Sequence, residues 1–163
     1  MSDQDQKTRQ DPGLLPVDEW YALVKKGANV AVHVVPNGRS MRPLIVGGRD
    51  SVEIWPLRRE LKKGDIVLFR RQDGANVLHR VWKLSGDTVT TYGDGCVKPD
   101  RPIKRDQVMG IATGLERKGR HFSLDTAGAR FQGRIWWILR PVVRFPRRAA
   151  SKVIRQWLGI KRK

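Results

Sequence analysis

Residues 64–81 read Gly-Asp-Ile-Val-Leu-Phe-Arg-Arg-Gln-Asp-Gly-Ala-Asn-Val-Leu-His-Arg-Val, and this stretch indicates the fold. Ile66–Phe69 is a short apolar run that follows a Gly-Asp turn, which is typical of a buried strand. The polar segment 72–76, with Asp-Gly at its centre, predicts a hairpin connection to a second strand over 77–84. The centre of the chain is therefore predicted to be a β-hairpin.

The same kinds of pattern continue on both sides of this hairpin. Asp18 is expected to cap a short helix that runs to Lys26 and stops at Gly27, with Trp20, Leu23 and Val24 on one face. Alternating or apolar segments separated by Gly, Pro and Asp turns predict further strands at 30–35, 51–55, 88–92, 107–115 and 121–124. Many short strands with turn signals favour a mainly β domain.

Three chemically informative residues lie in distinctive local contexts. Ser40 belongs to the segment Gly38-Arg39-Ser40-Met41-Arg42-Pro43, and His79 ends the apolar segment after the hairpin. Gly93-Asp94 opens a loop that reaches Asp100. A serine hydroxyl becomes a good nucleophile when a neighbouring base takes its proton, and an acid fixes the tautomer of that base. The three residue types are therefore the parts of a hydrolytic triad.

These segments resemble the S24/S26 serine peptidase family, which includes the signal peptidases and the LexA-like self-cleaving repressors. The resemblance covers roughly residues 30 to 113, with every box in the family's order. The matching boxes are Ser40-Met41-Arg42-Pro43, Leu61 to Phe69, Val77-Leu78-His79-Arg80-Val81, and Gly93-Asp94 through Asp100-Arg101 followed by Val108-Met109-Gly110. The resemblance implies a coiled β-sheet peptidase domain.

The box around His79 also indicates a subtype. Most bacterial members have a lysine at this place, whereas the endoplasmic-reticulum type has a histidine, so the resemblance implies a Ser-His mechanism with an acid. It aligns Asp100 with the third triad member and Asp94 with the other acid of that loop, and both stay candidates for the acid. Some bacterial relatives have, at the place of Gly38, a hydroxyl residue that donates to the oxyanion. Since glycine cannot donate in this way, the resemblance implies that the backbone N–H of Ser40 carries most of this role.

The composition of the chain indicates which partners, cofactors and targeting segments are expected. The chain has 163 residues, 33 Lys and Arg against 16 Asp and Glu, and a formal charge of +17, which implies an anionic partner. The one cysteine, Cys96, excludes an internal disulfide, and no Cys/His spacing is typical of zinc, so neither a metal nor another cofactor is expected. The polar start of the chain does not resemble a signal peptide, and no run of about 18 apolar residues predicts a transmembrane helix.

The last 35 residues differ from the rest of the chain. Residues 129–163 hold 11 Lys and Arg and no acid, together with Trp136, Trp137 and Trp157. Apolar residues at helical spacing with arginines on the opposite face predict a basic amphipathic helix, which is typical of a membrane interface. Nucleic acid is the disfavoured partner, because no helix-turn-helix pattern precedes the peptidase-like region. A third interpretation is a solvated basic helix that docks on a partner protein.

The sequence therefore predicts a disordered tail over 1–16, a peptidase domain over 17–125 and a membrane-associating tail over 126–163. The expected function is cleavage of a leader or propeptide by a peripheral membrane enzyme, and its expected location is the cytoplasmic face of the membrane. The alternative is a non-catalytic or self-processing member of the same family that acts as a regulatory or binding module.

Overall fold

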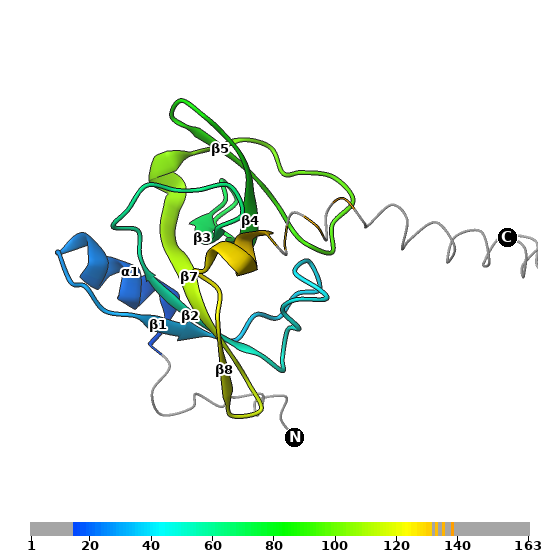
Figure 1. Ribbon diagram of the computed structural model, residues 1–163. Helices are drawn as coiled ribbons and strands as arrows, with labels where there is room; N and C mark the ends of the chain where they lie inside the picture. Colours follow the sequence, from blue (N-terminus) through cyan, green and yellow to red (C-terminus); the bar gives the residue numbers. More distant parts are fainter. Residues whose placement is uncertain (1–14, 132, 134, 136–137, 139–163) are drawn as a thin grey trace, which may run out of the picture.

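The computed structural model describes residues 15–131 together with 133, 135 and 138 (Figure 1). The predicted disordered tail lies almost entirely outside these residues, as does the predicted amphipathic helix beyond residue 138. One sheet dominates the described chain, and the prediction of a mainly β domain is confirmed.

The strands form a curled antiparallel half-barrel in the order β1-β2-β7-β3-β4-β5-β6, and β8 pairs with β7 (Figure 1). Helix α1 comes before the sheet, and a short 3-10 turn, Arg105–Gln107, comes before β7. The elements are α1 Val17–Lys25, β1 Val32–Val34, β2 Ser51–Pro56, β3 Ile66–Arg70, β4 Asn76–Ser85, β5 Thr88–Tyr92, β6 Ile103–Lys104, β7 Val108–Arg117 and β8 Arg120–Ser123.

The predicted hairpin is formed by β3 and β4. Arg71 N–H donates to Ala75 O at 2.9 Å, and Gly74 takes a positive φ of 83° in the turn, where a glycine avoids the strain of a side chain. The resulting register places Val67 opposite His79 and Ile66 opposite Arg80. The hairpin thus fixes the position of the predicted base within the sheet.

Strand β3 is buried on both of its faces. Successive side chains of a strand point to opposite sides, so Ile66 and Leu68 join the larger core cluster with Trp20. Val67 and Phe69 join a second cluster with Val89. This explains why the strand is a continuous apolar run rather than an alternating one.

Several local predictions are wrong in detail. The cap of α1 is Pro16 without a side-chain hydrogen bond, while Asp18 lies inside the first turn and pairs with Arg70. Leu23 is 42% exposed, because the nine-residue helix buries only a narrow face around Trp20. The two-residue strand β6 was not predicted, since a pair so short has no periodicity to detect.

After β8 the chain turns into a helix whose described residues are 127–131, 133, 135 and 138, here called the C-terminal helix segment. It packs closely on the sheet: a Cβ atom at Gly64 would lie 3.0 Å from Cβ of Arg130. Tyr92 Oη also donates to Gly133 O at 3.2 Å. The folded unit therefore continues past Asp125. Within the described part of the chain, no helix has the length and apolar character needed to cross a membrane.

Candidate active site

The four predicted site residues come from three parts of the fold. Ser40 lies in the turns after β1, His79 lies in β4, and Asp94 and Asp100 lie in the loop that follows β5. Ser40 and His79 line the same pocket, of about 360 Å³. Its other lining residues are mainly apolar and include Val34, Met41, Ile45, Leu68, Val77 and Leu78.

His79 is held by an acid at one ring nitrogen. Nδ1 of His79 lies 2.6 Å from Oδ2 of Asp100, and the hydroxyl of Thr91 donates to the same oxygen at 2.7 Å. The backbone closes the arrangement, because Asp100 N–H donates to Thr91 O at 2.8 Å. His79 is only 7% exposed, so the ring is packed in a fixed orientation.

The protonation of Asp100 decides which nitrogen of His79 is free to act as a base. Burial raises the pKa of this carboxyl, but the hydrogen bonds from His79 and Thr91 outweigh burial and hold the pKa below its ordinary value. An ionised carboxylate only accepts hydrogen bonds, so Nδ1 of His79 carries the hydrogen. The lone pair for proton abstraction is then on Nε2, which is the tautomer that a triad requires.

Gly93 brings the serine segment and the imidazole together. A Cβ atom at this position would lie 2.5 Å from Ser40 O and 2.9 Å from His79 Nε2, so the backbone at 93 touches both. Gly95 N–H donates to Ser40 O at 2.6 Å and fixes the turn that carries the serine. No hydrogen bond joins Ser40 Oγ to His79 Nε2 among the described residues, and in free enzymes such contacts often tighten only around substrate.

Asp94 has a different partner from Asp100. Arg80 donates through Nε and one terminal nitrogen to the two Asp94 oxygens, at 2.9 and 2.8 Å, and both side chains are 2% exposed. The other terminal nitrogen of Arg80 donates to Gly64 O at 2.8 Å. Since neighbouring residues on a strand face opposite sides, His79 and Arg80 hold the two acids of the same loop on opposite faces of β4.

The pair Arg80–Asp94 is expected to support the fold rather than the reaction. Asp94→Asn leaves a buried guanidinium without its opposite charge, and removing one partner of a buried pair costs about 3–5 kcal/mol of unfolding free energy. Denaturant unfolding monitored by circular dichroism measures this loss. The control is Asp73→Asn in the exposed pair Arg71–Asp73, which should shift the midpoint little. Equal shifts in the two variants would contradict the structural role of Asp94.

Sequence reasoning missed three residues that support the site. Thr91 orients Asp100, and Arg80 anchors Asp94. Gly133 lies directly over Arg80, since a Cβ atom there would be 2.4 Å from Cζ of the guanidinium. A charged residue within an apolar strand is a signal for Arg80, because such a charge needs a buried partner. Nothing local marks Thr91 or Gly133.

Met41 and Asp65 are buried, and Cys96 lies near the backbone of Ser40. Met41 is 4% exposed, belongs to the core and lines the pocket, while Asp65 is 2% exposed and binds Arg59 at 2.8 Å. Cys96 Sγ lies 4.0 Å from Ser40 O. No group of three or more metal-binding side chains occurs among residues that the structure describes.

Comparison with known proteins adds no relative from which a role could be transferred. No protein-family model matches the chain, and no curated protein matches it at a significant level. The function must therefore be argued from the residues and their geometry.

Proposed function

We propose that this protein is a serine endopeptidase of the S24/S26 kind, with Ser40 as nucleophile, His79 as general base and Asp100 as the acid that orients His79. The observation that carries the proposal is the hydrogen bond of 2.6 Å between His79 Nδ1 and Asp100, on a histidine that shares a pocket with Ser40. The proposal rests as well on the sequence boxes that resemble the family.

The chemistry follows from these positions. Ser40 Oγ attacks the carbonyl carbon of the scissile peptide bond while its proton passes to His79 Nε2. The resulting oxyanion accepts a hydrogen bond from the backbone N–H of Ser40, which has no acceptor among the described residues. His79 then gives the proton to the departing amine, and a water molecule, activated by the same nitrogen, hydrolyses the acyl-enzyme.

The pocket is suited to a peptide substrate in an extended conformation. Strand β1 is at the end of the sheet order, and Val34 of this strand lines the pocket. An added peptide strand along an open sheet edge gains main-chain hydrogen bonds and places alternate side chains in pockets. The mainly apolar lining favours apolar side chains, and the resemblance to the family implies that those next to the cut are small.

Cleavage of peptides added to the purified protein tests this function. Leader-like peptides with small residues near the cut should give two defined fragments by mass spectrometry, and a peptide with bulky charged residues at those places should not. Failure to cut any added peptide, with cleavage restricted to the protein's own chain, would support the self-processing alternative instead.

We further propose that the enzyme works at an anionic membrane surface through its basic C-terminal region, which includes the 11 lysines and arginines of residues 129–163. Each basic residue near an anionic bilayer contributes about 1 kcal/mol. Burial of apolar side chains adds a part that salt does not screen, at about 25 cal/mol per Å².

The full chain should therefore bind anionic vesicles strongly at low salt and measurably at high salt, with a blue shift of tryptophan emission. Vesicle sedimentation measures this binding, and a chain ending after Ile138 should bind more weakly, because it lacks nine basic residues of the tail. Equal binding by the shortened chain would contradict a contribution from residues 139–163.

A further inference from the structure

The C-terminal helix segment has two unlike faces. Successive residues of an α-helix turn by about 100°, so Phe131, Ile135 and Ile138 project within roughly 60° of one another, and Gly133 projects on the opposite side. The first three are exposed, at 62%, 39% and 65%, whereas Gly133 is buried. The segment thus presents an apolar stripe outward while its inner face rests on the domain.

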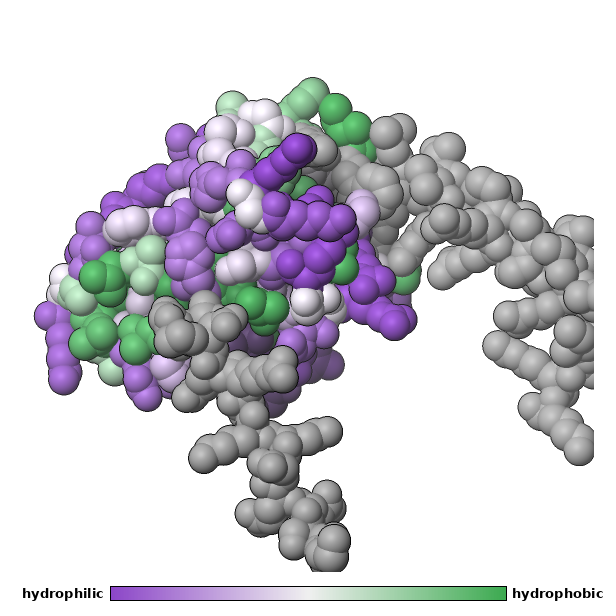
Figure 2. Space-filling model, turned by 90° about the horizontal axis from the view of Figure 1, so that it is seen from below, coloured by the Kyte–Doolittle hydropathy of each residue, from purple (hydrophilic) through white to green (hydrophobic). Residues whose placement is uncertain are grey.

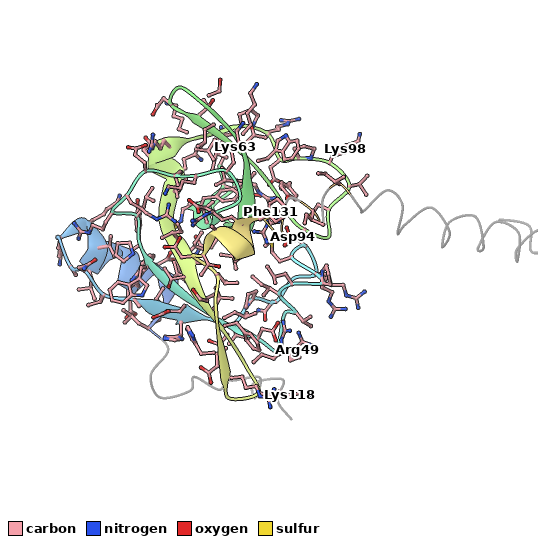
Figure 3. All side chains as sticks on the ribbon, viewed as in Figure 1. Arg49, Lys63, Asp94, Lys98, Lys118 and Phe131 are labelled. Atoms are coloured by element: carbon pink, nitrogen blue, oxygen red, sulfur yellow. The ribbon has the colours of Figure 1, made fainter. Side chains whose placement is uncertain are left out.

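Basic side chains of the folded domain lie beside both ends of this stripe. One hollow beside the segment is lined by Lys62, Lys63 and Phe131, and a second by Lys63, Lys83 and Ile138. Figure 3 labels Lys63 and Phe131 on this part of the molecule, together with Asp94 of the loop that follows β5. The three lysine side chains are exposed.

Not every nearby charge is available to a ligand. Arg130 donates to Asp125 at 2.7 Å, and Arg59 donates to Asp65 and Asp125 at 2.8 and 2.5 Å. These arginines are already compensated by acids of the same domain. The lysines therefore carry the electrostatic part of any contact made by this face.

We propose that the apolar stripe and the three lysines form a docking face for an anionic lipid bilayer. Phe131, Ile135 and Ile138 enter the boundary between headgroups and acyl chains, and the ammonium groups contact headgroup phosphates. Charge complementarity selects this occupant, since the chain carries +17 overall and continues from the helix into 25 residues with nine basic and no acidic side chains. Most of the surface in Figure 2 is hydrophilic, with hydrophobic patches among it.

This inference rests on the proposed function at the membrane, and it places the lipid contact on the Arg80 side of β4, opposite to the face that carries His79. Gly133, on the inner face of the segment, contacts Arg80, and Arg80 holds Asp94 in the loop that touches Ser40 O and His79 Nε2. A chain docked in this way would be held at the membrane surface together with substrates bound there.

The test compares two double variants of the full chain that carry the same charge. Phe131→Glu with Ile138→Glu changes the docking face, and Leu23→Glu with Phe122→Glu changes apolar residues elsewhere that are also exposed, at 42% and 44%. Both variants are tested on vesicles of phosphatidylcholine and phosphatidylglycerol. The first variant should bind at least about tenfold more weakly than the second, because it loses apolar burial at the contact. Circular dichroism monitors the fold of both.

A third variant tests the face without changing the helix. Lys62→Gln with Lys63→Gln should weaken binding to the same vesicles, most clearly at low salt, and should leave the fold unchanged because both positions are exposed. If this variant and the Phe131 variant bind like the control, the docking face is wrong, even if the tail still binds. Binding of the full chain to DNA but not to these vesicles would also overturn it.

The result of the lipid-binding experiment does not depend on whether the protein cleaves peptides. Ser40→Ala removes only a pocket hydroxyl and should dock as the original chain does. Vesicle binding that depends on Phe131 and the lysines would therefore stand even if no peptide were cleaved, and cleavage of soluble peptides would stand even if the face did not bind lipid.

Discussion

Replacing Ser40 with alanine should lower the rate of peptide cleavage by at least about a thousandfold, because alanine has no oxygen to attack the scissile carbonyl. The fold should be unaffected. Ser40 lies in a turn, its hydroxyl makes no hydrogen bond with another described residue, and its backbone carbonyl still accepts from Gly95. The measurement is kcat/KM on a leader-like peptide, with circular dichroism on the same preparation.

Ser123→Ala is the matched control for this experiment. Ser123 is an exposed serine at the end of β8 and does not line the pocket, so its loss should leave the rate unchanged. Near-normal cleavage by folded Ser40→Ala protein would show that Ser40 is not the nucleophile. The proposed roles of His79 and Asp100 would then be wrong as well, because both roles depend on Ser40 as the nucleophile.

Asp100→Asn should reduce kcat by roughly ten-thousandfold while the fold is kept. The asparagine amide can donate to Nδ1 of His79, which favours the tautomer with hydrogen on Nε2 and removes the base from the reacting position. The same change removes the charge that stabilises the imidazolium. A kcat loss with little change in KM, measured across pH, is the expected signature of a group that acts through His79.

Asp94→Asn provides the comparison within the same loop. Its expected effect is on the free energy of unfolding through Arg80, so any folded fraction should retain more activity than Asp100→Asn. Conversely, a greater loss of kcat in folded Asp94→Asn than in Asp100→Asn would move the acid of the triad to Asp94. The two carboxylates are thus distinguished by one pair of measurements on each variant, stability and rate.

Much of the sheet was predictable from short-range pattern. Strands β2, β3, β4 and β5 begin and end within one or two residues of the predicted segments, because alternation, apolar runs and Gly-Asp turns act locally. The predictions failed where tertiary contacts override a local signal. Asp18 has the chemistry of a cap, yet the chain starts the helix at Val17 and uses Asp18 in a pair with Arg70.

The candidate site, like the sheet, was predictable from the sequence only in part. The sequence indicated Ser40, His79 and two loop acids as residue types with the chemistry of a triad, and the described structure places Ser40 and His79 in one pocket with Asp100 on the imidazole. The resemblance aligned Asp100 with the third triad member but kept Asp94 as a candidate, since both acids lie in one loop. The partner of each acid depends on the face of β4 that its side chain reaches, which is the His79 face for Asp100 and the Arg80 face for Asp94.

The sequence by itself determined the mainly β domain, the hairpin that carries His79 and the strongly basic end of the chain. Only the tertiary structure decided that Asp100 contacts His79, that Asp94 contacts Arg80, and that Gly133 lies over this pair. The physical reason is that strands and turns follow from contacts between near neighbours in sequence. The acid pairs and the cover by the helix instead require segments up to about 50 residues apart to meet, at a cost in chain entropy that only the assembled core offsets.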